Sequence, residues 1–275
     1  MATKKTLDTA TVFGIAMGVG SLVISMVLEF RELNPDFGSP FLKLSALLII
    51  FGGTFGCTML SFPMEQIRNI PTLFRIALFW EQSDDMALVE TVSKLAEVAR
   101  REGILALEPK RDELRATYPF LAKGFELVID GRPPEVVKEV LTNEIYAMEE
   151  RHKVGAEVFT CLGGYAPTMG IVGTVVGLIG ALSKAGESTG DPTAVVEAIA
   201  TAFIATFYGI ATANLLFLPI ATKLQRRTER EVFLRIVQTE GILATQNGDN
   251  PRVIAQSLKA FFRAKEPAKG KEPAK

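Results

Sequence analysis

The sequence predicts an all-α integral membrane protein with four transmembrane helices. Four stretches of the 275-residue chain hold almost no ionisable side chain, and each is close to or longer than the roughly 20 apolar residues that a helix needs to cross a bilayer. The chain is 48% hydrophobic, which suits one membrane domain together with one modest water-soluble domain. The four predicted spans are residues 10–28, 43–62, 155–183 and 194–222.

The first two spans form an N-terminal membrane hairpin, residues 1–62. Lys4 and Lys5 precede the first apolar run, as in a signal peptide, but the run ends in Glu29-Phe30-Arg31 and not in a small-residue cleavage site. We therefore interpret it as a retained membrane anchor. Glycines interrupt the second span, and membrane helices tolerate them better than soluble helices do.

The basic residues predict the orientation of the chain. Almost all of them lie in the N-terminus, in residues 63–154 or in residues 223–275, whereas the two short connections hold only Arg31, Lys43 and Lys184. Because basic residues close to membrane spans stay on the cytoplasmic side, we expect both termini in the cytoplasm.

Residues 63–154 are predicted to form a helical cytoplasmic domain between the second and third spans. Met86–Glu102 has its apolar residues on one stripe, the spacing of an amphipathic helix, and Gly103 ends it. A second helix is expected at Pro119–Asp130, and a third begins at Pro133-Pro134. The residues expected to face inward are Leu88, Val92, Leu95, Ala96 and Ala99 in the first helix, and Val136, Val137, Val140, Leu141, Ile145 and Met148 in the third.

The third and fourth spans form a second membrane hairpin, residues 155–222, and cytoplasmic helices are expected to follow at 223–263. Residues 264–275 contain Pro and charged side chains but no large apolar residue, which predicts a disordered tail. No alternating strand pattern of useful length is visible anywhere in the chain.

Stripes of small residues mark the third and fourth spans. In lipid, where hydrophobicity does not drive helices together, such stripes allow close approach of helix backbones. Two interpretations stay open: the two spans pack on each other, or the small faces line an oligomer axis or receive a partner helix. The predicted helix-packing face comprises Gly170, Gly173, Gly177 and Gly180 in the third span, and Ala202 and Gly209 in the fourth.

Prolines and threonines occur in the same two spans. Pro167 and Pro219 each remove a backbone donor, which predicts a kink, and a structural and a mechanical role for these kinks both stay open. Thr174 and Thr206 either bond a carbonyl of their own helix or present oxygen to a partly dehydrated cation.

The sequence excludes several classes of function. It contains no phosphate-binding Gly-x4-Gly-Lys-Ser/Thr motif, no His-Glu-x-x-His motif and no Cys/His cluster, so we expect neither an enzyme nor a bound cofactor or metal. The balance of 30 basic and 31 acidic residues argues against a nucleic-acid partner. No Asp, Glu, Lys, Arg or His lies between Ala198 and Thr222, so an intramembrane carboxylate for ion transport must come from another molecule.

Several sequence strings follow one another in the order and spacing of a known family. They resemble the flagellar motor stator A subunits, the MotA and PomA family, from the first span to about residue 263. The strings are IPTLFR at 70–75, ARREGILALE at 99–108, MEERH at 148–152, YAPTMGIVGTVVGLIGAL at 165–182, and ATFYG at 205–209 followed by Pro219.

The resemblance implies an inner-membrane subunit that couples cation flow to torque. In that family five copies surround two copies of a B subunit (MotB/PomB-like), whose single span supplies the ion-binding Asp. Pro167 and Pro219 match the family prolines linked to conformational coupling near that Asp. Arg100 and Glu108, which by themselves read as a solvated charged face, match the charged pair that engages the rotor switch protein FliG. Other expected partners are membrane lipid and copies of the chain itself.

The resemblance also bears on the transported ion. Thr174 matches a position that is threonine in sodium-type subunits and alanine in several proton-type ones, and Thr206 is shared more widely. Since oxygen ligands suit hard cations, both residues are assigned to the ion pathway, with Na⁺ favoured over H⁺. Two alternatives are an ExbB/TolQ-like subunit that energises outer-membrane processes, which typically has one span before its cytoplasmic domain, and a stand-alone solute transporter or channel, which would need polar midplane residues.

Overall fold

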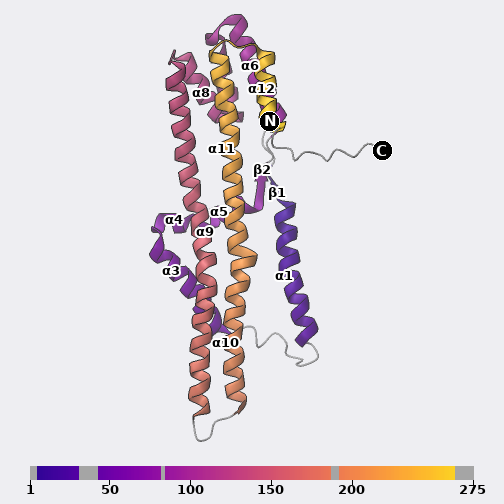
Figure 1. Ribbon diagram of the computed structural model, residues 1–275, viewed down its shortest axis with the longest axis vertical. Coiled ribbons are helices and arrows are strands. Elements are labelled where there is room, and N and C mark those ends of the chain that lie inside the picture. The colour runs from indigo at the N-terminus through magenta and orange to yellow at the C-terminus, as the bar shows by residue number, and fades with distance from the viewer. Residues whose placement is uncertain (1–4, 31–42, 82–83, 187–191, 264–275) are drawn as a thin grey trace, which may run out of the picture. The chain divides into compact units, whose positions relative to one another are not determined.

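The computed structural model describes residues 5–30, 43–81, 84–186 and 192–263, and these are helical almost throughout (Figure 1). The all-α prediction is confirmed. The chain divides into two compact units. The first, here called the membrane unit, consists of Thr6–Trp80 and His152–Arg226. The second, here called the helical domain, consists of Met1–Lys5, Glu81–Arg151 and Arg227–Lys275.

Among the described residues, four helical stretches are long and apolar enough to cross a membrane, which agrees with the four predicted spans. Short helices α4 (Met64–Arg68) and α5 (Ile70–Leu78) follow the second span. The first span is α1 (Thr9–Phe30); the second is α2 (Leu44–Leu47), η1 (Leu48–Gly52) and α3 (Gly53–Ser61); the third is part of α9 (Pro134–Ala185); the fourth is α10 (Pro192–Thr212), η3 (Ala213–Phe217) and the start of α11 (Leu218–Gln246).

Large apolar side chains cover the outside of these spans. Phe13 is 74% exposed, Leu182 is 73% exposed and Phe203 is 64% exposed. An apolar surface of this kind is unfavourable in water and suits lipid or neighbouring helices. Both the apolar composition of the spans and their exposed apolar side chains are typical of a membrane protein.

One pair of short elements is absent from the sequence predictions. β1 (Lys5–Leu7) pairs with β2 (Phe79–Glu81), and the backbone N–H of Asp8 donates to the carbonyl of Leu78 at 3.0 Å. Strands of three residues are too short to display a two-residue alternation, so the pattern could not indicate them.

The helical domain contains the helices that the apolar periodicity predicted. Asp84 caps α6 by accepting from the N–H groups of Met86 and Ala87, and Gly103 ends that helix with a φ of 89°. The predicted start of the third helix is also confirmed, at Pro134. The helices are α6 (Asp85–Glu102), η2 (Ile104–Lys110), α7 (Arg111–Thr117), α8 (Pro119–Ile129), the start of α9, the end of α11 and α12 (Pro251–Arg263).

A single apolar core holds the helical domain together. All five residues predicted to face inward on α6 are buried, with at most 8% exposed. On α9 one predicted core residue is wrong: Val136 is 38% exposed. The core includes Leu88, Val92, Leu95, Leu107, Phe120, Leu121, Phe125, Val137, Leu141, Val237, Ile242 and Leu258.

The boundaries between units differ from the predicted ones. Residues 63–80 were assigned to the helical domain by position in the sequence, but they group with the membrane unit, where Ala77 is buried in one cluster with Phe159 and Leu162. The third helix of the domain and the third span form one helix, α9. The predicted disordered tail at 264–275 lies outside the described residues, as does most of the outer connections.

Candidate ion pathway and helix interface

The small residues of the third and fourth spans lie between α9 and α10. A methyl group on Gly177 would lie 2.7 Å from Cβ of Ala202, and one on Gly173 would lie 2.7 Å from Cβ of Ala205. One on Gly170 would lie 3.0 Å from Cα of Thr206. Real Cβ atoms essentially never approach as closely as at Gly173 and Gly177, and the contact at Gly170 is tighter than most real ones, so this face fits glycine best. Of the two interpretations left open, the structure thus places these glycines at an interface within the chain.

The two ends of this face differ. At Gly209 a methyl group would meet the carbonyl group of Ala166, with 3.2 Å to its carbon atom. At Gly180 it would meet no atom within 4 Å. Gly180 therefore belongs to the stripe in sequence but not to this interface.

The two threonines assigned to the ion pathway lie side by side at the same interface. The Thr174 hydroxyl lies 3.1 Å from the carbonyl oxygen of Gly170 on its own helix and 3.2 Å from that of Ala202 on α10. The Thr206 hydroxyl lies 3.2 Å from the same Gly170 oxygen on α9, and the two hydroxyls contact each other. Each of the two hydroxyls therefore forms a hydrogen bond to the other helix and does not bond only within its own helix.

This arrangement has more oxygen atoms than protons. Two hydroxyls contribute two donatable protons, and each hydroxyl oxygen keeps lone pairs after donating. Two hydroxyl oxygens and the carbonyl oxygens of Gly170 and Ala202 thus gather around Thr174. Both threonine side chains are only partly buried. A group of neutral oxygens that is open on one side can contact a hard cation without trapping it.

The two prolines lie in helical turns that face each other. Pro167 lies inside α9, which continues through it, and Pro219 follows the π-helical turn η3. Gly163, whose carbonyl would pair with an N–H at position 167, approaches Leu218 so closely that a methyl group on it would lie 2.5 Å from Leu218 Cδ2. The structure thus brings the turns that contain the two prolines into contact.

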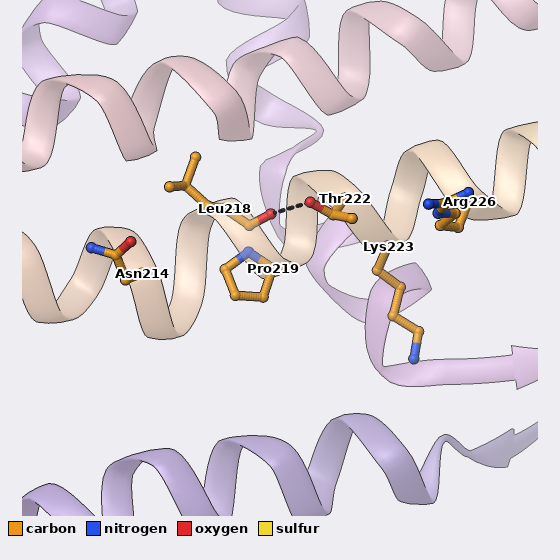
Figure 2. A pocket seen from close by; sticks show the side chains of 6 residues that line it. All are labelled: Asn214, Leu218, Pro219, Thr222, Lys223 and Arg226. Carbon is orange, nitrogen blue, oxygen red and sulfur yellow. Dashed lines mark hydrogen bonds between the residues drawn. The ribbon is translucent and has the colours of Figure 1, made fainter.

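A hollow that the sequence did not indicate opens on the fourth span next to Pro219. It has a volume of about 510 Å³. Figure 2 shows its six residues on η3 and α11, with Pro219 between Asn214 and Thr222 along the helix. The sequence signal that could have indicated this hollow is Asn214, an uncharged amide in an otherwise apolar span. The lining residues are Asn214, Leu218, Pro219, Thr222, Lys223 and Arg226.

The charged end of the hollow is fixed by the N-terminal segment. Lys223 forms an ion pair with Asp8 and a hydrogen bond with the hydroxyl of Thr11. Asp8 also accepts from the N–H of Ala10 at 3.1 Å, at the first turn of α1. The Asp8 carboxylate thus compensates the Lys223 charge and caps α1 at the same time.

The two residues assigned to the rotor contact belong to the helical domain and both are exposed. Arg100 lies in the last turn of α6 and Glu108 in η2, on either side of the turn at Gly103. Neither forms an ion pair with another described residue, in contrast to Arg101, which pairs with Glu97 at 2.8 Å. Their charges remain available to a partner.

Comparison with known proteins identifies the family. The model of the MotA/TolQ/ExbB proton channel family matches residues 113–235. Motility protein A of Bacillus subtilis (strain 168) is 39% identical over 262 residues, which cover 94% of this chain and 93% of that protein. The chain belongs to the MotA/TolQ/ExbB proton channel family. This membership confirms that it is an ion-transport component and not an enzyme.

Other members of the family support the same assignment. Chemotaxis protein PomA of Vibrio alginolyticus is 34% identical over 256 residues, which cover 93% of this chain and 96% of that protein. The structure of the flagellar MotAB stator complex from Bacillus subtilis matches with a TM-score of 0.82 and 37% identity, over 95% of this chain and 97% of that chain. The resemblance to MotA and PomA inferred from the sequence is confirmed.

Proposed function

We propose that this chain is an A-type stator subunit of a flagellar motor, which works with a B subunit to convert cation flow into torque. The observation that carries the proposal is the match to Motility protein A over 94% of this chain. The fold agreement with a MotAB stator complex, at a TM-score of 0.82, supports a MotB-like partner and an oligomeric assembly. The stoichiometry that we propose is five copies of this chain around two of the B subunit.

The ion pathway of the proposed assembly uses residues of two proteins. The B subunit supplies the ion-binding Asp, since no carboxylate lies between Ala198 and Thr222. This chain supplies the oxygens of Thr174 and Thr206, which contact each other between α9 and α10. Neutral oxygens of this kind solvate Na⁺, which supports the proposal that Na⁺ is the transported ion and H⁺ is not.

The torque step follows from neutralisation of the partner's Asp. Each ion that crosses 100 mV supplies about 2.3 kcal/mol, which is enough to bias a step between two arrangements of closely packed helices. Pro167 and Pro219, whose turns are in contact through Gly163 and Leu218, are proposed to carry that change along α9 and α11. Arg100 and Glu108 are proposed to engage the rotor protein FliG, with both termini in the cytoplasm.

The number of spans argues against the ExbB/TolQ-like alternative. Two of the candidate spans, α1 and α2–α3, precede the helical domain, whereas chains of that type typically have one. The match to motility proteins over nearly the whole length points the same way.

The test is functional replacement in a motile bacterium that lacks its own stator genes. This chain is expressed with the B subunit from the neighbouring gene, and swimming speed is measured in media in which Na⁺ is replaced stepwise by K⁺ at constant pH. We expect motility in Na⁺ and its loss in K⁺. Equal speed in both media would reject Na⁺ coupling, and a stably inserted pair that never restores motility would reject the stator function.

A further inference from the structure

The fourth span changes its hydrogen-bond register where α10 passes into α11. At the end of the π-helical turn η3, the N–H of Leu218 bonds the carbonyl of Ala213, five residues earlier. In a regular α-helix that N–H would bond the carbonyl of Asn214. The next residue, Pro219, has no N–H at all. The main-chain oxygen of Asn214 therefore lacks its α-helical donor, the N–H of Leu218. It also lacks a π-helical donor, because position 219 is a proline.

The side chain of the same residue presents a second oxygen. The Asn214 amide nitrogen donates to the carbonyl of Ile210 at 2.9 Å, which leaves Oδ1 of Asn214 as an acceptor. Asn214 is exposed and lines the hollow beside Pro219 (Figure 2). A π-helical turn inside an α-helix often marks a functional site. Here it accompanies two neutral oxygens of one residue within an otherwise apolar span.

The spacing of oxygens along the fourth span separates them into different positions, so they do not form a single site. Thr206, Asn214 and Thr222 are eight residues apart, which corresponds to about 12 Å at 1.5 Å per residue. This separation is too large for any two of them to coordinate one ion. Thr222 lines the same hollow, and its hydroxyl, which donates to the carbonyl of Leu218 at 3.0 Å, keeps acceptor capacity.

The charges around the hollow favour passage over retention. The oxygens of Asn214 and Thr222 are neutral, and hard cations accept such ligands. Lys223 and Arg226 lie at the far end of the hollow, and Lys223 forms an ion pair with Asp8. The basic side chains at this end disfavour a resident cation there. Conduction requires binding sites that an ion can leave.

We propose that Asn214 is a cation-relay residue, which receives the ion after the Thr174–Thr206 pair and passes it toward Thr222. Its two oxygens replace part of the ion's hydration shell at the π-helical turn, and Pro219 keeps one of them free of a helix donor. The inference rests on the proposed function, because it assumes that cations cross the assembly along α10 and η3.

The test compares Asn214→Ala with Asn214→Gln in the complex with the B subunit. Swimming speed and cation current are measured over a range of Na⁺ concentrations in cells without other stators. For Asn214→Ala we expect a current reduced about tenfold, the effect of one lost ligand interaction, together with a higher Na⁺ concentration for half-maximal speed. Asn214→Gln, which keeps an amide oxygen, should recover a large part of both.

A matched control separates the relay from a structural role. Thr212→Val removes a hydroxyl two residues away that bonds the carbonyl of Tyr208 at 2.7 Å and does not line the hollow. It should leave the Na⁺ response unchanged. Co-purification with the B subunit measures assembly in every variant.

The outcomes distinguish the two proposals. A wild-type complex that gives neither current nor motility would overturn the proposed function, and the relay with it. An active wild type with an unchanged current in Asn214→Ala would overturn the relay alone. Loss of co-purification in both Asn214 variants would assign the residue to assembly and would also overturn the relay.

Discussion

The helical domain and the membrane unit are packed with different kinds of side chain. The core of the domain contains large apolar residues such as Phe120, Leu121 and Phe125, each with at most 6% exposed. The closest contacts between α9 and α10 involve Gly, Ala and Thr. In water, burial of apolar area stabilises at about 25 cal/mol per Å². In lipid that gain is absent, so close backbone approach and interhelical hydrogen bonds hold the spans together.

Glycines show the same difference at single positions. In the helical domain, a methyl group on Gly124 would meet the end of the flexible Ile242 side chain, with 3.2 Å to Cγ1. In the membrane unit, one on Gly209 would meet the main-chain carbonyl of Ala166. A side chain can change rotamer, whereas a packed helix backbone cannot. The two regions are therefore expected to respond in opposite ways to smaller and to larger residues.

Truncation in the helical domain should have the largest effect on stability. Phe125→Ala removes a ring that is 2% exposed in the core, and we expect a loss of about 3–5 kcal/mol. The measurement is the temperature at which the purified complex leaves its monodisperse peak in size-exclusion chromatography. Tyr146→Ala, at a side chain that is 64% exposed, is the control and should leave this temperature nearly unchanged. Similar shifts for both variants would contradict a core at Phe125.

Enlargement in the membrane unit should have the next largest effect. Gly177→Leu places a side chain against Ala202, whose Cα would be 3.1 Å from the new Cβ, and we expect a loss of about 1–3 kcal/mol or a displaced helix. Gly180→Leu is the matched control, because a Cβ at Gly180 would meet no atom within 4 Å. Motility should be lost in the first variant and retained in the second. Normal motility of Gly177→Leu would rule out the close-contact face.

Much of the fold follows from the sequence because periodicity is a local property. The α6 stripe and the start of α9 at Pro134 were predicted from spacing and helix signals alone. Val136 was wrong because the buried face of α9 is formed at steps of three and four by Val137, Leu141, Ile145 and Met148. A residue one position earlier points about 100° away from that face.

The candidate site was less accessible to sequence reasoning. Periodicity identified Gly170, Gly173 and Gly177 as one face but could not decide what covers it, because the partner helix is not encoded in the spacing. The hollow at Asn214 depends on a register shift that the structure records between Ala213 and Leu218. Such a shift involves backbone hydrogen bonds and leaves no mark in the pattern of apolar residues.

Removal of a hydroxyl at the interface should change stability less than either substitution above. Thr174→Ala breaks the contact with Thr206 and the bond to the carbonyl of Ala202, and an interhelical hydrogen bond in a membrane contributes about 0.6–1.7 kcal/mol. Assembly with the B subunit should persist. We expect the Na⁺ concentration for half-maximal swimming speed to rise, as measured in media of graded Na⁺ content. An unaltered Na⁺ response would exclude Thr174 as a ligand.

Charge reversal at the exposed turn of the helical domain should have the smallest effect on stability. Arg100→Glu alters an exposed side chain that forms no ion pair with a described residue, so the free energy of unfolding should change by about 0.5 kcal/mol or less. Torque should nevertheless fall strongly, because the proposed rotor contact is electrostatic and a reversed charge repels its partner. Bead-rotation speed under load measures it.

Arg252→Glu supplies the control for that reversal, since Arg252 is an exposed basic residue of the same domain on α12. It makes the same change in net charge, and it should leave torque unchanged. Equal loss of torque in both variants would attribute the effect to net charge and not to a contact at Arg100. Loss of membrane insertion in Arg100→Glu would assign Arg100 a role in folding and would contradict the rotor contact. We do not expect this loss, because Arg100 is a surface charge in the last turn of α6.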